Sequence, residues 1–185
     1  MKHGAIVIGM AVLIGAAALQ AQSPAPKPGP EHKKLEIWVG NWTYESENKA
    51  TPYQPAGKFS GTAKVRPVLG GFFVEWRGEE KGPSGTHRWL EIDGYDALNK
   101  KFMWNCFFSD GSFNTVTYTV EANTVNYSGT LFQGEKQYKI RGSAVFAPDL
   151  MSWVEKREVS ADGKTWIPSS ETKMTKTKSS PKKLD

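Results

Sequence analysis

The segment from Leu150 to Ser160 places an acid and a base two residues apart in a strand-like run. Trp153, Glu155 and Arg157 occupy alternate positions there. Successive side chains of a strand point to opposite faces, so these three share one face. A charged pair on the inside of a sheet is costly unless the two groups pair or meet solvent. The pattern therefore fits an internal structural pair, an outward-facing pair, or the polar anchor that orients a ligand in a cavity.

A second candidate face alternates His87, Trp89 and Glu91, and we expect it to line the mouth of a cavity. Trp104 and Cys106 alternate in the same way, although a row of this kind usually packs in a core.

The run from Phe72 to Arg77 leaves its inward direction open. Phe73, Glu75 and Arg77 form one face, and the opposite face is more apolar. With the tryptophan that opens the first expected strand, the candidate ligand-contacting residues are Trp42, Glu75, His87, Trp89, Trp104, Trp153, Glu155 and Arg157.

Other chemistry finds little support. Two histidines, His32 and His87, follow the N-terminal segment, and Cys106 is the single cysteine, so neither a metal site nor an intramolecular disulfide is expected. No Gly-x-Ser-x-Gly turn is present, and we predict no catalytic residues. The carboxylates of Glu79 and Glu80 stand beside Lys81 and are expected to be solvated.

Beyond Gly40 the chain is divided into about ten short runs that are dense in β-branched and aromatic residues. The turn signals between them are Pro52 to Gly57, Gly70-Gly71, Gly82 to Gly85, Asp93-Gly94 with a loop ending near Lys100, Asp110-Gly111, Ala122-Asn123, Gln133-Gly134, Pro148-Asp149 and Asp162-Gly163. Even spacing without long helices predicts an all-β fold, and closing the sheet would hide its edges. We therefore predict a single antiparallel up-and-down barrel of about ten strands, preceded by a short helix over 31–39. A barrel of this size can enclose a cavity.

The short helix followed by Gly40-Asn41-Trp42 resembles the opening of the calycin barrels, which comprise lipocalins, fatty-acid-binding proteins and nitrobindin-like proteins. In those folds the Trp packs across the closed end and the helix is a plug. A basic residue near the last strand stacks on that Trp, and Lys176 stands where it would be expected.

A longer series of motifs is similar to a family of exported bacterial proteins of unknown function with a lipocalin-like barrel. The series is His32, Leu35, Gly40-x-Trp42, Leu69-Gly70-Gly71-Phe72, Gly94-Tyr95-Asp96, Trp104 and Asp162-Gly163-x-x-Trp166. The resemblance implies a fold and no activity. Nitrobindin-like barrels bind haem through a late His, but no His follows His87, so no cofactor is expected.

The ends of the chain predict export. Residues 1–21 have the basic start, apolar run and small residues of a signal peptide, and the run of about 15 residues is too short for a stable membrane span. We expect a Pro-rich tether over 22–30, the barrel over 31–176 and a basic tail over 177–185. The net charge of +5 comes from Lys2 and from five lysines against one aspartate after Thr172, so no nucleic-acid-binding face is expected.

Three functions are compatible with these features. The first is a periplasmic or extracellular barrel that binds a small, largely apolar ligand. The second is a filled barrel that serves as an envelope interaction module, and the third is a small enzyme. The sequence leaves the ligand and the oligomeric state open.

Overall fold

The computed structural model describes residues 26–177. The expected signal peptide, residues 22–25 of the tether and the basic tail beyond Thr177 lie outside these residues. Ten strands follow a short helical segment: β1 (Gly40–Asn48), β2 (Gly57–Val68), β3 (Phe73–Gly82), β4 (Gly85–Asp96), β5 (Lys101–Phe108), β6 (Phe113–Glu121), β7 (Thr124–Gln133), β8 (Lys136–Phe146), β9 (Ser152–Ser160) and β10 (Ile167–Thr177).

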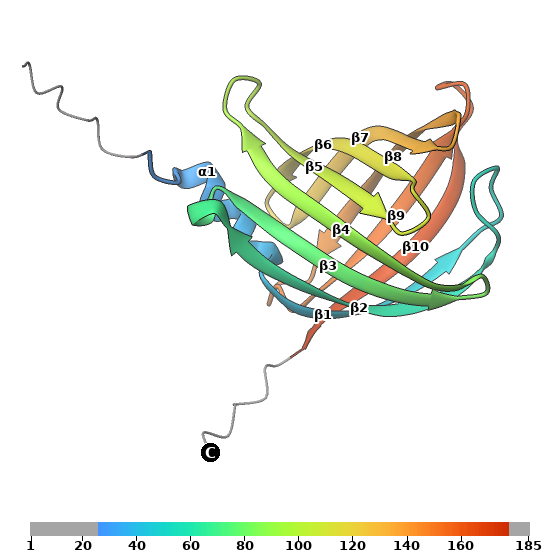
Figure 1. Ribbon diagram of the computed structural model, residues 1–185. Coiled ribbons are helices and arrows are strands. Elements are labelled where there is room, and N and C mark those ends of the chain that lie inside the picture. Colours follow the sequence, from blue (N-terminus) through green and yellow to red (C-terminus); the bar gives the residue numbers. More distant parts are fainter. Residues whose placement is uncertain (1–25, 178–185) are drawn as a thin grey trace, which may run out of the picture.

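The strands form a closed antiparallel barrel, as predicted. Each strand pairs with its neighbours in sequence, and β1 pairs with β10 to complete the wall (Figure 1). A short 3₁₀ turn, η2 (Leu69–Gly71), joins β2 to β3. Closure gives each of these ten strands two partners, so none of them presents a free edge to another chain.

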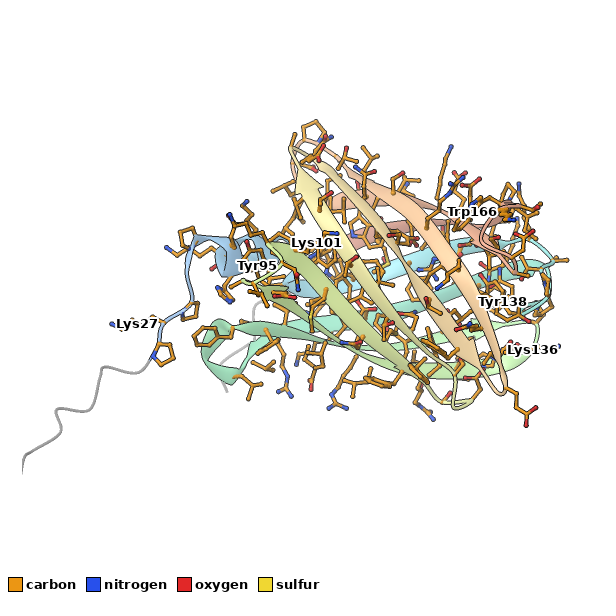
Figure 2. All side chains as sticks on the ribbon, turned by 90° about the horizontal axis from the view of Figure 1, so that it is seen from above. Lys27, Tyr95, Lys101, Lys136, Tyr138 and Trp166 are labelled. Atoms are coloured by element: carbon orange, nitrogen blue, oxygen red, sulfur yellow. The ribbon has the colours of Figure 1, made fainter. Side chains whose placement is uncertain are left out.

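The N-terminal segment closes one end of this barrel. Helix α1 (Pro30–Lys33) continues directly into the 3₁₀ helix η1 (Lys34–Trp38), which places the predicted helix correctly but makes most of it 3₁₀. Leu35 and Trp38 point inward and are buried. Tyr95 and Lys101 lie at this end, whereas Lys136 and Tyr138 lie toward the other (Figure 2).

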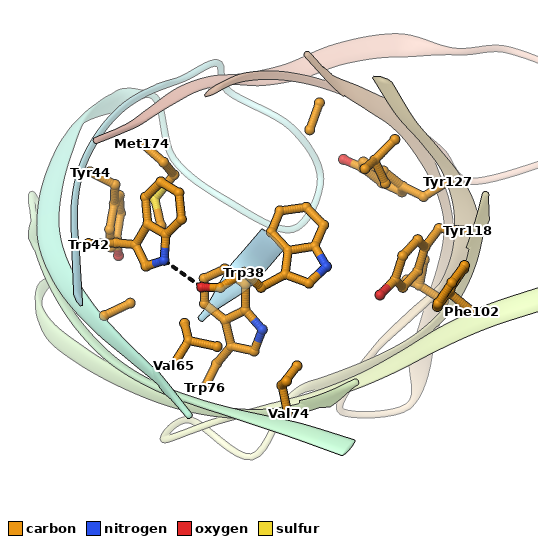
Figure 3. Close-up of a cluster of buried hydrophobic side chains, with 14 of the residues drawn as sticks. Trp38, Trp42, Tyr44, Val65, Val74, Trp76, Phe102, Tyr118, Tyr127 and Met174 are labelled. Atoms are coloured by element: carbon orange, nitrogen blue, oxygen red, sulfur yellow. Dashed lines mark hydrogen bonds between the residues drawn. The ribbon is translucent and has the colours of Figure 1, made fainter. Parts of the chain in front are cut away.

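Trp42 fixes the plug to the wall. Its indole N–H donates to the carbonyl of Trp38 at 2.7 Å (Figure 3). On another side the ammonium of Lys176 lies 4.8 Å from the ring centre and donates to the carbonyl of Ile37 at 3.3 Å. Trp42 is 1% exposed, so its ring is enclosed and its polar atom is paired.

One predicted turn is wrong. Asp93-Gly94 lies inside β4, which continues to Asp96, and the turn forms where the Asp96 carboxylate accepts the backbone N–H groups of Leu98 and Asn99. Gly94 serves packing instead, because a Cβ there would stand 2.6 Å from the ring of Phe73 on β3.

Candidate functional site in the barrel cavity

A cavity of about 450 Å³ occupies the barrel. It extends from Trp38 at the plug to Gln54, Ser84 and Asp110 in the loops at the opposite end. Most ligand sites are concave, largely apolar and carry a few polar groups, and this cavity has that character.

Aromatic rings form the floor. The ring of Trp38 lies 5.6 Å from Trp76, 5.1 Å from Phe146 and 5.9 Å from Trp153, measured between centroids. Tyr118 lies 6.4 Å away from it in an edge-on arrangement. Figure 3 shows rings of this cluster pointing into the barrel from different strands. The floor is therefore rigid, flat-sided and apolar.

Four polar atoms of this region have no hydrogen-bond partner among residues 26–177. They are the indole N–H groups of Trp38, Trp76 and Trp153 and the Oδ1 atom of Asp93. A buried polar group without a partner costs about 1–3 kcal/mol. All four residues line the cavity, although these four atoms are themselves covered by neighbouring atoms.

Two carboxylates stand together on β4. Glu91 is opposite Trp76 on β3 and Cys106 on β5, and Asp93 follows it two residues later on the same face. Burial raises the pKa of Glu91 to about 7. Burial, followed by the repulsion of Glu91, raises the pKa of Asp93 well above its ordinary value. Glu91 therefore changes its protonation near neutral pH and can accept or donate a hydrogen bond.

A second polar group lies on β7 and β9. The guanidinium of Arg157 donates to Glu155 at 3.0 Å and to the Tyr127 hydroxyl at 3.0 Å, and that hydroxyl donates to Glu155. The ring of Tyr127 reaches this pair by crossing Gly142 on β8, where an added Cβ would collide with the hydroxyl. Arg157 and Glu155 neutralise each other, which makes this a closed polar network.

The mouth of the cavity has a similar hydrogen bond, in which a tyrosine crosses a glycine to reach a carboxylate. The hydroxyl of Tyr44 on β1 crosses Gly61 on β2 and donates to Glu80 on β3. Burial and the Glu80 carboxylate raise the pKa of Tyr44 above its ordinary range. His87 meets Ser84 at 2.9 Å nearby.

The structure brings most of the predicted residues to one place. His87, Trp89, Trp104, Trp153, Glu155 and Arg157 all line the cavity. Trp42 does not line it, because its ring is enclosed at the plugged end.

The expected position of Glu75 in the lumen is wrong. Its carboxylate lies on the outer face, where it accepts from Arg66 at 3.0 Å and from Arg77 at 3.0 Å. Hydrogen bonds from Arg77 lower its pKa. The inward face of β3 carries Val74 and Trp76, which are buried.

Sequence reasoning missed several cavity residues. Glu80 was expected to be solvated, and Asp93 was assigned to a turn. Asn114 accepts the indole N–H of Trp104 at 2.9 Å. Alternation was the available signal, because Asp93 continues the series His87, Trp89, Glu91 and Asn114 continues the apolar face of β6.

Two negative findings apply to the described residues. Residues 26–177 contain no group of three or more His, Cys, Asp or Glu side chains arranged to hold a metal ion. None of the helices in that range combines the length and apolarity that a membrane crossing requires.

Comparisons with known proteins give the chain a family. The sequence profile of a family described as "Protein of unknown function (DUF1579)" matches residues 27–178. No curated protein matches the chain.

Two solved structures are similar to the barrel. Rv2717c from M. tuberculosis is 10% identical, the match covers 81% of this chain and 99% of that one, and the TM-score is 0.59. A de novo designed fluorescence-activating β-barrel is 11% identical, with coverage of 77% and 96% and a TM-score of 0.42. At such identities the likeness to Rv2717c indicates a shared fold and no shared activity.

Proposed function

The chain belongs to the family described as "Protein of unknown function (DUF1579)", and from this premise we propose that it holds a small, largely apolar ligand with one polar group in its barrel cavity. The ligand's body lies on the aromatic floor around Trp38. Its polar group meets polar side chains of the cavity wall, such as Glu91.

One observation supports this proposal above the others: a space of about 450 Å³ is bordered by buried polar atoms that the described chain leaves without partners. A folded protein rarely keeps such atoms unless solvent or a ligand satisfies them. The filled-barrel alternative requires an interior packed by its own side chains, and this volume argues against it.

We further propose a calycin-like binding barrel that is exported. The plug, Trp42 and Lys176 support the first part through their arrangement at the closed end. The signal-like sequence of residues 1–21 supports the second and favours a location in the periplasm or outside the cell. Fractionation of the native host, with a cytoplasmic marker as control, tests the location.

Native mass spectrometry of the purified full chain tests ligand binding. We expect a small molecule to travel with the protein and to be released on denaturation. Extracted ligand added back should quench tryptophan emission, because Trp38, Trp76, Trp104 and Trp153 surround the cavity. A protein that carries nothing, and whose emission and unfolding temperature are unchanged by apolar probes and lipid extracts, contradicts the proposal.

A further inference from the structure

The cavity lining has more acidic than basic side chains. Five of the side chains that line it are carboxylates, whereas the basic ones are Arg157 and His87. The carboxylates are Glu80, Glu91, Asp93, Asp110 and Glu155. Arg157 is bound to Glu155 by a hydrogen bond of 3.0 Å and is not free to neutralise the others.

Asp93 is the most deeply placed of these acids. It is 2% exposed, its Oδ2 atom accepts the Tyr118 hydroxyl at 3.3 Å, and its Oδ1 atom has no partner within the described chain. On β5 it is opposite Trp104, and on β3 it is opposite Val74. Asp93 is thus a buried acceptor between apolar neighbours, where an uncompensated negative charge is costly, and Glu91, two residues away on the same face, is the more open acid of the pair.

The surroundings suit a positive charge in a second way. Trp38, Trp76 and Trp104 all line the same space, and the negative face of an aromatic ring attracts a cation within about 6 Å. An anionic group would instead face Glu91 and Asp93 directly.

We infer that the ligand carries a basic, positively charged nitrogen on an apolar aromatic body, with the nitrogen bound by Asp93 and Glu91 and the body on the aromatic floor. This inference rests on the proposed function and names the class of ligand for the same cavity. Organic cations are commonly recognised by rings together with a carboxylate.

Three probes that share one bicyclic ring test this inference: 2-(2-naphthyl)ethylammonium, 2-(2-naphthyl)ethanol and 2-naphthylacetate. Calorimetric titration of the full-length protein at about pH 8 and roughly physiological salt gives their affinities. We expect the ammonium to bind at least about tenfold more tightly than the alcohol, and the carboxylate to bind most weakly.

Amino-acid substitutions test which residues cause the preference for the ammonium probe. Asp93→Asn should reduce the ammonium-to-alcohol ratio to about twofold or less while alcohol binding persists, and Glu91→Gln should reduce it in the same direction. Glu75→Gln on the outer face is the matched control and should keep the full ratio. Near-ultraviolet circular dichroism checks that each variant is folded.

The failures of the two proposals are distinguishable. If the alcohol or the carboxylate binds as well as the ammonium, or if a neutral or acidic molecule travels with the native protein, the cavity binds ligands but the cation inference is wrong. If none of the probes binds and no molecule travels with the protein, both proposals fall.

Discussion

Trp42 and the aromatic floor around Trp38 use their indole N–H groups in opposite ways. At the plugged end Trp42 has its N–H bonded to Trp38 and its ring under Lys176. In the cavity the indole N–H groups of Trp76 and Trp153 have no partner among the described residues. Trp42 is thus fully satisfied, whereas the floor keeps indole N–H groups on Trp38, Trp76 and Trp153 that are unpaired within the described chain.

The difference in hydrogen bonding indicates that one part of the core serves the stability of the fold and the other part serves its function. The surroundings of Trp42 are complete, because its indole N–H is paired and its ring is enclosed. The cavity gathers buried acids and unpaired donors that destabilise the empty protein, and natural proteins tolerate such costs mainly at sites of function.

The variant Trp42→Ala is the strongest test of this difference between the two regions. We expect the free energy of unfolding to fall by about 3–5 kcal/mol, because the substitution removes a fully buried ring and leaves a cavity. Denaturant unfolding measures it. Trp89→Ala is the control, and it should cost about 1–2 kcal/mol because Trp89 is half-buried at the cavity. Equal costs would mean that the two regions do not differ in packing.

A change of pH acts on the buried acids of the cavity. Burial raises the pKa of Glu91 to about 7, so the folded state holds a proton that the unfolded state releases at lower pH. Stability is therefore highest near about pH 5 and falls as pH rises toward about 8, by up to about 3 kcal/mol.

Glu91→Gln should flatten this dependence, as measured by denaturant unfolding at several pH values. The turn residues Asp96, Asp110 and Asp162 have lowered pKa values and ionise below this range, so they do not obscure it. Stability of the unmodified protein that stays constant across this range would contradict the buried acid pair.

The variant Arg157→Met tests the charged pair inside the cavity. It leaves Glu155 without its cation, and we expect a loss of about 1–3 kcal/mol at about pH 8, since the pair is largely but not fully buried. The double variant Arg157→Met with Glu155→Gln should recover most of it. No recovery would show that Arg157 acts through packing and not through its charge.

Alternation and turn chemistry predicted the wall of the barrel and most of the cavity face. On β4 and β9 alternation places aromatic residues and charges on one face, and the structure turns that face toward the cavity, a direction that the sequence left open for Glu155 and Arg157. Asp93-Gly94 was misassigned because the glycine makes room for a ring on the neighbouring strand, and no local signal announces a contact across strands. The hydrogen bonds from Tyr44 to Glu80 and from Tyr127 to Glu155 could not be predicted from the sequence, because they too are contacts across strands.

The smallest expected effect concerns two pairs with the same spacing. Glu75 with Arg77 lies outside the barrel, whereas Glu155 with Arg157 lines the cavity. The residue between each pair explains the difference, because the burial of Trp76 turns its neighbours outward and the exposure of Lys156 turns its neighbours inward.

Glu75→Gln should leave the unfolding midpoint within about 2 °C and ligand affinity unchanged, since exposed ion pairs contribute little. Glu155→Gln, measured beside it by the same thermal scan and titration, should change both quantities because it opens the network around Tyr127. If the two variants behaved alike, the intervening residue would not decide which face a charged pair takes, and the assignment of the inner wall would lose its physical basis.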